Sequence, residues 1–197
     1  MDTDADAELM LRVARGDRSA FTPLFDRHHR GVARFAFRFV GDRARAEELA
    51  QDIFVKLYRN AGRYRPSARF KTFLYRVAAN HCLNEVRRGE YRVKHLSEGP
   101  EEGEPLETPA PEAERPDAHL AGRELESALG IALRSLSDRE RAAFTLARFE
   151  GMAYREIAEV LEASEAAVKS LIHRATLTVA RSLEAFQAGA EPLRSRA

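Results

Sequence analysis

Hydrophobic residues recur every three or four positions along most of this chain, which is the spacing of one face of an α-helix. Glycine and proline are few and clustered, so helix should dominate. The predicted fold class is therefore all-α. The predicted helices cover residues 8–15, 20–40, 43–60, 70–88, 125–136, 138–149, 154–161 and 165–186.

The stretch 152–174 predicts a helix-turn-helix. Its first helix carries Ile157 and Val160 on one side, and three polar or small residues at 162–164 interrupt the pattern. Ser164 is a suitable N-cap for the second helix, which repeats apolar residues about one turn apart. Its opposite face is polar and basic, so it can enter the major groove of DNA. Two antiparallel amphipathic helices are also common in proteins that never bind DNA. The alternative that this stretch is only a structural helix pair therefore stays open. The candidate DNA-contacting residues are Arg155, Ser164, Glu165, Ala166, Lys169, Ser170, His173 and Arg174.

A second candidate surface begins at the loop 62–70, where an aromatic residue stands among arginines. Aromatic rings and guanidinium planes stack on unpaired bases, and the positive charges hold phosphate. The helix that follows adds further polar and basic groups. Taken singly, Tyr75 and Asn80 could equally be residues at the edge of a core. The candidate single-strand contacts are Arg63, Tyr64, Arg65, Arg69, Lys71, Thr72, Tyr75, Arg76, Asn80, Asn84, Arg87 and Arg88.

Charge divides the chain into three blocks that its net charge of +1 conceals. Residues 12–94 hold 20 Lys and Arg against 8 Asp and Glu, residues 96–118 hold one against 8, and residues 123–183 hold 9 of each. The basic block suggests a polyanionic partner, although an arginine-rich solvated surface would look similar. Proline and glutamate dominate the middle block, which cannot bury enough apolar surface to fold alone. We expect two small helical domains, 8–91 and 123–186, joined by a flexible acidic linker, 92–122.

The remaining composition excludes several classes of protein. One cysteine in 197 residues excludes an internal disulfide and a cysteine-based zinc cluster. No apolar run approaches the roughly 18 residues of a membrane span, and the acidic N-terminus is unlike a signal peptide. No phosphate loop or catalytic motif occurs, and the adjacent His28 and His29 point about 100° apart on a helix, a poor metal pair. We therefore expect a cytoplasmic protein without membrane insertion that is not an enzyme and uses no cofactor or metal.

Three segments together resemble the sigma-70 family of bacterial RNA polymerase sigma factors. They are residues 8–60, which include AEELAQDIFVKLYRN, residues 70–88, which read FKTFLYRVAANHCLNEVRR, and residues 136–175, which read LSDRERAAFTLARFEGMAYREIAEVLEASEAAVKSLIHRA. More narrowly, the chain is similar to the small extracytoplasmic-function (ECF) group, which keeps only regions two and four. The resemblance implies an alternative sigma factor that binds core RNA polymerase and directs promoter recognition, promoter opening and transcription initiation.

The resemblance also implies a role for each segment. The first domain would be region two, whose loop and following helix melt and capture the minus-ten promoter strand. The second domain would be region four, which reads the minus-thirty-five element. Implied protein partners are the clamp helices of the polymerase largest subunit, the flap of the second-largest subunit and, as in many relatives, an anti-sigma factor. The implied polymerase-docking residues are Glu48, Gln51, Asp52 and Lys56.

The chain departs from the family pattern at a few positions. Phe73 stands where relatives often carry a tryptophan beside the melting loop. Leu171 and Thr176 replace residues that are basic in many relatives, so the preferred minus-thirty-five sequence stays open. The acidic linker matches in position a segment that relatives thread toward the RNA exit path. Its charge could mimic nucleic acid there, or the linker could be a soluble tether.

Two other classes of protein would fit parts of the pattern. A free-standing helix-turn-helix regulator with an N-terminal sensing or dimerising domain would bind operator DNA tightly without polymerase. A helical enzyme with an appended DNA-binding module is disfavoured, because no active-site motif is present.

Overall fold

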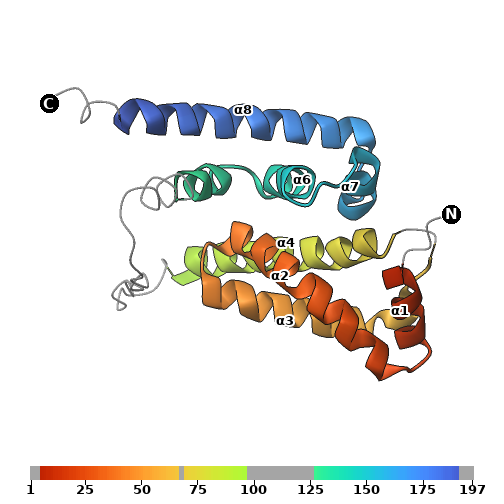
Figure 1. Ribbon diagram of the computed structural model, residues 1–197. Coiled ribbons are helices and arrows are strands. Elements are labelled where there is room, and N and C mark those ends of the chain that lie inside the picture. Colours follow the sequence, from red (N-terminus) through yellow and green to blue (C-terminus); the bar gives the residue numbers. More distant parts are fainter. Residues whose placement is uncertain (1–4, 67–68, 97–126, 191–197) are drawn as a thin grey trace, which may run out of the picture.

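The computed structural model describes residues 5–66, 69–96 and 127–190, and every regular element in these ranges is helical (Figure 1). The all-α prediction is confirmed. Residues 127–134 form a further helix, and two short 3-10 turns, Arg18–Ala20 and Ala61–Arg63, complete the described elements. The labelled helices are α1 (Ala5–Ala14), α2 (Phe21–Val40), α3 (Arg43–Arg59), α4 (Phe70–Leu96), α6 (Asp138–Arg148), α7 (Tyr154–Leu161) and α8 (Glu165–Ala190).

Local capping chemistry explains why most helix ends match the sequence prediction. Gly41 closes α2 with a left-handed backbone, φ +72°, and its amide donates to the Phe37 carbonyl at 2.8 Å. Asp42 then caps α3, because its carboxylate accepts the Arg45 amide at 2.7 Å. At the start of α6, the Ser137 amide donates to the Glu140 carboxylate at 3.2 Å, as the predicted capping box requires.

Two helices run further than predicted. Helix α4 continues to Leu96 instead of ending near residue 88, and α8 continues to Ala190 instead of ending near residue 186. Between Pro66 and Pro100 the sequence has no proline to stop a helix, which lets α4 extend beyond its apolar face. The rest of the predicted linker, residues 97–122, lies outside the described residues.

The N-terminal body is a bundle of α2, α3 and α4, with α1 packed across one end (Figure 1). Its core includes the fully buried side chains of Leu24, Phe35 and Leu49. Ionic hydrogen bonds hold α1 in place, because the Asp6 carboxylate accepts from Arg27 and contacts His28 Nε2 at 2.8 Å.

The C-terminal body consists of α6, α7, α8 and the helix 127–134. Helix α8 lies along α6, where Phe144 and Val179 belong to a buried cluster with Leu136. Ile157 of α7 is also fully buried. This packing leaves one long side of α8 facing away from the rest of the molecule (Figure 1).

The two bodies pack against each other through α4 with α7 and through α2 with α6. One cluster of buried hydrophobic residues continues across the junction and includes Leu74 and Ala78 of α4 with Leu146 and Ile157. The tether predicted from the sequence therefore joins two helical bodies that touch over several helices. Within the described residues, no helix combines the length and apolarity needed to cross a bilayer.

Candidate nucleic-acid interface

The predicted helix-turn-helix is present as α7, a three-residue turn and α8. Glu162 takes the left-handed conformation that ends α7, with φ +50°, and the Ala163 amide donates to the Ala158 carbonyl at 3.0 Å. Ser164 caps α8, because its hydroxyl accepts the Ala167 amide at 3.2 Å. The left-handed turn costs Glu162 about 1–2 kcal/mol, which the packing of the two helices offsets.

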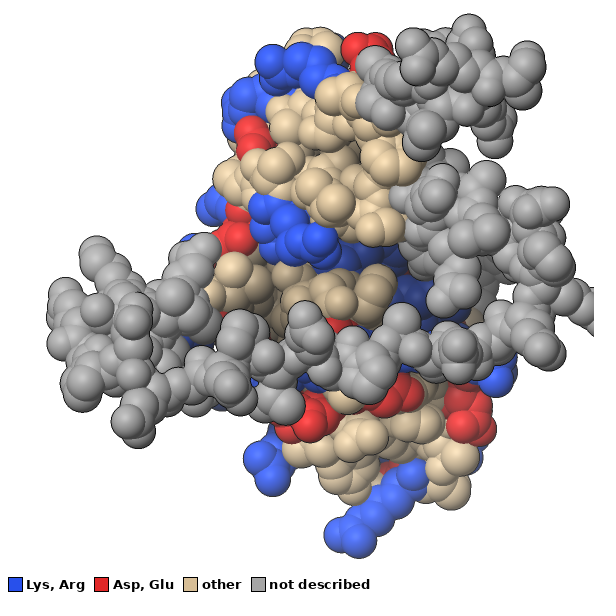
Figure 2. Space-filling view, turned by 90° about the vertical axis from the view of Figure 1, so that its left-hand side faces the viewer, with Lys and Arg blue, Asp and Glu red and all other residues tan. Residues whose placement is uncertain are grey.

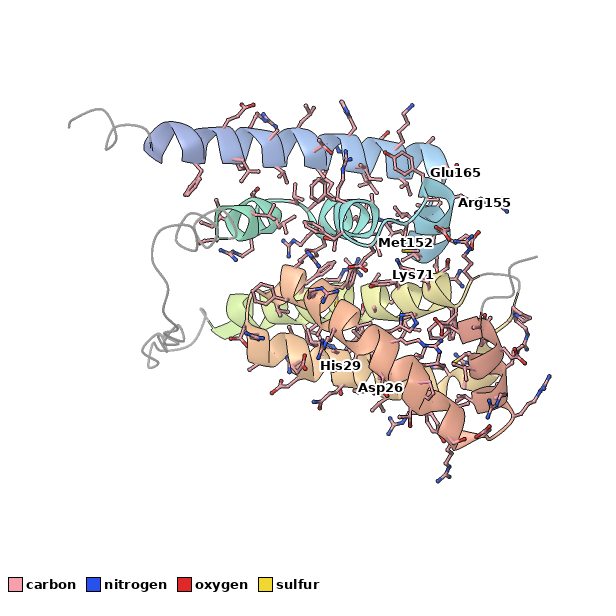
Figure 3. The ribbon with its side chains drawn as sticks, in the orientation of Figure 1. Asp26, His29, Lys71, Met152, Arg155 and Glu165 are labelled. Atoms are coloured by element: carbon pink, nitrogen blue, oxygen red, sulfur yellow. The ribbon has the colours of Figure 1, made fainter. Side chains whose placement is uncertain are left out.

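Helix α8 exposes its predicted DNA-contacting face. The apolar side chains of Val168 and Ile172 point inward and are buried. Small residues at the start of the exposed face would let the helix backbone approach a DNA groove closely. Figure 3 shows Arg155 and Glu165 at this outer end of the C-terminal body. The predicted residues that are exposed are Arg155, Ser164, Glu165, Ala166, Lys169, Ser170, His173 and Arg174.

Arg174 is exposed, but it is held by a neighbouring helix. Its Nε donates to Glu140 Oε1 at 2.7 Å, so the capping residue of α6 also orients an arginine of α8. The Arg174 guanidinium and the Ser137 hydroxyl lower the pKa of Glu140. Spacing in the sequence could not predict Glu140 as a partner, because the two residues are 34 positions apart and only the packing of α6 on α8 joins them.

The candidate strand-binding residues fall into three groups. The loop arginines and the candidates in the later part of α4 are open to solvent, whereas the first turns of α4 contact the C-terminal body and are partly buried. The exposed members are Arg63, Arg65, Arg69, Asn80, Asn84, Arg87 and Arg88, the half-buried members are Lys71 and Arg76, and the buried members are Tyr64, Thr72 and Tyr75.

Tyr64 is packed against the start of α4. Its ring centroid lies 5.1 Å from that of Phe73 and 6.4 Å from that of Phe70, and only 2% of the residue is exposed. Tyr64 therefore cannot stack on a base unless the loop rearranges. Phe73, which stands where relatives often have tryptophan, is half-buried in the same aromatic group.

Tyr75 and Lys71 both contact Glu150, which lies in the turn between α6 and α7. The Tyr75 hydroxyl donates to the Glu150 carboxylate, and Lys71 Nζ donates to the Glu150 carbonyl oxygen. Burial and the nearby Glu150 carboxylate raise the pKa of Tyr75, so its hydroxyl stays a donor. Figure 3 shows Lys71 and Met152 facing each other where the bodies meet. In this conformation Tyr75 is therefore a buried residue at the edge of the core, as one of the two alternatives proposed. Asn80, in contrast, is exposed.

Positive charge gathers where the two bodies meet. Figure 2 shows Lys and Arg side chains in a band across the middle of the visible face. Arg38 of α2 is one residue at the junction, and its guanidinium lies 3.8 Å from the Phe149 ring centroid. Arg141 of α6 is buried and donates to the Phe39 carbonyl at 3.2 Å. Neither residue was a sequence candidate, because each is defined by a partner about a hundred positions away.

The four predicted polymerase-docking residues all lie exposed on α3. Asp52 Oδ2 lies 3.7 Å from Nε2 of the buried His81, and Lys56 Nζ donates to its Nδ1. Burial and the Lys56 charge lower the pKa of His81, so the neutral ring accepts from lysine. Glu48 is paired with Arg45 at 2.7 Å. The remaining member, Gln51, borders an apolar pocket.

This apolar pocket, of about 290 Å³, lies between α2 and α3. Two of the hydrophobic residues at this pocket, Val55 and Tyr58, are exposed. The pocket therefore adds hydrophobic surface next to the four docking candidates. Its lining residues are Phe21, Phe25, Gln51, Phe54, Val55, Tyr58 and Arg59.

Comparison with protein families gives two matches along the chain. Residues 24–91 match the family described as Sigma-70 region 2, and residues 128–178 match the family described as Sigma-70, region 4. The first match covers α2 to α4, and the second covers the helix-turn-helix. Together the two matches cover more than half of the chain.

Curated relatives extend over nearly the whole chain. The chain is 31% identical over 183 residues to the RNA polymerase sigma-H factor of Pseudomonas aeruginosa, covering 92% of this chain and 95% of that protein. It is 32% identical over 187 residues to the ECF RNA polymerase sigma factor SigM of Mycobacterium tuberculosis, covering 94% and 88%.

Solved structures with the same fold include two protein complexes. CnrH bound to the cytosolic domain of CnrY is 26% identical, with a TM-score of 0.67, and the match covers 92% of this chain and 99% of that chain. RpoE of Bartonella quintana, in complex with the anti-sigma factor NepR, has a TM-score of 0.64 at 19% identity, and the match covers 83% and 96%. The second likeness concerns the fold alone.

Proposed function

The chain belongs to the sigma-70 family of RNA polymerase sigma factors, in its ECF group, and from this premise we propose which surface performs each step of promoter recognition. As a sigma factor it binds RNA polymerase and DNA and directs transcription initiation, and it is not itself an enzyme. The boundaries proposed for its two functional units are residues 8–91 and 123–186.

We propose that α8 reads the minus-thirty-five element in the major groove. The observation that supports this proposal is the exposed face of α8 between Glu165 and Arg174, which carries small residues near its start and polar or basic residues after them. Side chains such as Lys169 and His173 can donate hydrogen bonds to base edges there. The same duplex contact would place Arg155 of α7 beside the phosphate backbone.

The loop 61–66 and helix α4 are proposed to capture the opened minus-ten strand. Arg63 and Arg65 are exposed and can hold phosphates, and Asn80 and Asn84 can donate and accept hydrogen bonds from unpaired bases. Extracting a base from the stack costs a few kcal/mol, which such contacts offset.

Helix α3 and the apolar pocket beside it are proposed to dock on the clamp helices of the polymerase largest subunit. The pocket supplies hydrophobic area next to the exposed polar residues Gln51 and Asp52, a combination typical of protein interfaces. The C-terminal body is proposed to contact the flap of the second-largest subunit.

Transcription with purified core polymerase tests the whole proposal. Sheared genomic DNA of the source organism would serve as template, and the 5′ ends of the transcripts would be sequenced. The expected result is a small set of start sites that need this protein and share minus-ten and minus-thirty-five elements. Tight binding to an operator without polymerase, together with no dependent transcript, would instead favour a free-standing regulator.

A protein that holds the factor inactive is proposed as a further partner. The support is CnrH, which was solved with the cytosolic domain of CnrY and matches 92% of this chain. Because polymerase and promoters lie in the bacterial cytoplasm, we expect the protein to act there. Co-purification from the source organism, before and after envelope stress, would test both expectations.

A further inference from the structure

His81 of α4 contacts two charged residues of the helix proposed to dock on polymerase. The residue is 7% exposed, and its Nδ1 lies 2.5 Å from Lys56 Nζ. An ammonium group can only donate, so Nδ1 accepts and the ring proton lies on Nε2. Nε2 in turn lies 3.7 Å from Asp52 Oδ2. One buried ring therefore contacts two of the four docking candidates.

The spacing of Asp52 and Lys56 makes this ring important. They are four positions apart in α3, so they lie on the same side of the helix, where opposite charges attract each other. A direct pair would neutralise both charges at the surface. In this structure each of them contacts His81, and both side chains are exposed.

The Nε2 atom of His81 is buried and lacks a hydrogen-bond partner among the described residues. Its distance from Asp52 Oδ2 is longer than that of a hydrogen bond. An unpaired buried donor lowers the stability of the fold, so an apolar side chain would suit this position better if the residue served only the core. The contact with Lys56 is therefore the feature of this ring that calls for a functional explanation.

A second polar link joins the docking helix to α4. Arg45 of α3 donates to Glu85 of α4 and also to Glu48, at 2.7 Å. Three of the four docking candidates, Glu48, Asp52 and Lys56, are thus connected to α4 either directly or through one side chain. Such contacts hold an interface in its binding geometry before the partner arrives.

We propose that His81 is a positioning residue for polymerase docking: its neutral ring accepts from Lys56, keeps the ammonium away from Asp52 and so leaves both charges available to the partner. This role rests on the proposed docking of α3. Asp52 can then meet a basic side chain of the polymerase, and Lys56 an acidic one. An imidazolium could not do this, because it would repel Lys56 and attract Asp52.

The charged groups around the ring determine the pH range in which it is neutral. They are Lys56 and Asp52 of α3, and Glu85 and Arg88 of α4. Burial and the Lys56 charge lower the pKa of His81 from its ordinary value of 6.5, while the two carboxylates act in the opposite direction. The ring is therefore neutral at about pH 7 and becomes charged only in more acidic solution. Docking should weaken as the pH falls through this lowered pKa.

The test measures the dissociation constant of the full-length chain for immobilised core polymerase by surface plasmon resonance. His81→Leu removes the acceptor but keeps a side chain that fills the buried position. His81→Asn places an amide oxygen where Nδ1 stood, so it can still accept from Lys56. His28→Leu is the control, because it makes the same substitution at a histidine that contacts Asp6 of α1. Circular dichroism verifies that each variant is folded.

We expect His81→Leu to bind core polymerase about fivefold more weakly than wild type, near the upper limit for one exposed ion pair. His81→Asn should lose at most about twofold, and His28→Leu should bind as wild type. In a Lys56→Met background His81→Leu should cause no further loss, because no ammonium remains to pair with Asp52. Lowering the pH from about 7.5 to about 5 should weaken the binding of wild type more than that of His81→Leu.

Equal losses in His81→Leu and His81→Asn, or an undiminished loss in the Lys56→Met background, would overturn the proposal, because the ring would then only fill the core. Equal affinities of His81→Leu and wild type would overturn it as well, provided that Asp52→Lys still weakens docking. If His81→Leu does not fold, the same pH comparison is made between wild type and His81→Asn, and equal profiles would be the contrary result. Unchanged binding of Asp52→Lys would instead refute the proposed docking of α3 itself.

Discussion

Two helices of this protein are proposed to contact DNA, and they differ in how accessible they are. Helix α8 presents its polar face to solvent from Glu165 to Arg174. In the first turns of α4, by contrast, Thr72 and Tyr75 are buried, and Tyr75 lies between Phe35 of α2 and Glu150 of the other body. Both faces look alike in sequence, because both mix small, polar and basic residues. The difference teaches that a polar helix face indicates what a helix can bind but not whether that face is free.

The physical reason lies in the side chains. Tyr75 brings a large ring and one hydroxyl, so it can be buried when an acceptor such as Glu150 is available. Lys169 and Ser170 of α8 have less apolar area to bury, and burying the charge of a lysine is costly unless it is paired and hydrogen-bonded. Tyr75 can therefore be buried beside a protein carboxylate, whereas the polar face of α8 stays exposed.

The largest expected effect comes from breaking the contact between the bodies at Arg141. This buried guanidinium donates to carbonyls of both bodies, including Leu133 at 2.8 Å and Phe39 at 3.2 Å. The substitution Arg141→Ala should lower the free energy of unfolding by about 3 kcal/mol, because several buried carbonyls lose their donor. Denaturant unfolding measures it, and Arg148→Ala, exposed on the same helix, should change little. A loss below about 1 kcal/mol would contradict the assigned role.

A second prediction concerns α3, whose face is exposed like that of α8 but is proposed to bind protein. Asp52→Lys should weaken the binding of core polymerase by about thirtyfold, or about 2 kcal/mol, because it reverses a charge beside the apolar pocket. Circular dichroism should be unchanged, since Asp52 is exposed. Glu47→Lys, an equal charge change on the same helix, is the control. Unchanged co-purification with polymerase would refute the docking assignment.

The exposed helix can be tested at Arg174. Arg174→Ala should weaken binding to the minus-thirty-five element about tenfold, in line with the loss of one well-placed base or phosphate contact. Holoenzyme binding is measured on a cognate promoter and on one whose minus-thirty-five element is scrambled. An equal loss on both templates would argue against a sequence-specific role for this arginine.

The smallest predicted effect concerns the support of Arg174 by Glu140. Because the pKa of Glu140 is lowered, its contribution to stability is present above its ordinary pKa of 4.5 and is lost as the pH falls below that value. Arg174 is 58% exposed, so the pair contributes on the order of 0.5 kcal/mol. The unfolding midpoint of Glu140→Gln should therefore depend less on pH than that of wild type. Both are measured from pH 5 to pH 3 at intervals of roughly one unit. An identical pH profile in wild type and variant would remove Glu140 from this role.

Most of the fold could be predicted from local signals. Gly41 followed by Asp42 marks one helix end and the next helix start, and the box from Ser137 to Glu140 marks another. These signals act over a few residues, so a single sequence contains them. The extension of α4 to Leu96 was missed, because no apolar periodicity accompanies it.

The candidate surfaces were predicted less completely than the fold. The candidate residues of α8 lie exposed as expected, although Arg174 also binds Glu140 of the neighbouring helix α6. Glu150, Arg141 and the pocket beside Val55 could not be found from spacing, since each depends on elements that are distant in the chain. Tyr64 keeps its predicted role as a proposal, although its ring is packed against Phe73 in this conformation.

The sequence by itself determined the all-helical class, the positions of the helices and the two sigma-family segments, because periodicity, caps and motifs are local properties of the chain. Only the tertiary structure decided which polar faces are free, because burial depends on what another element brings to the same place. Burial therefore distinguishes the two helices: Glu150 contacts Lys71 of α4, whereas the polar face of α8 is exposed to solvent.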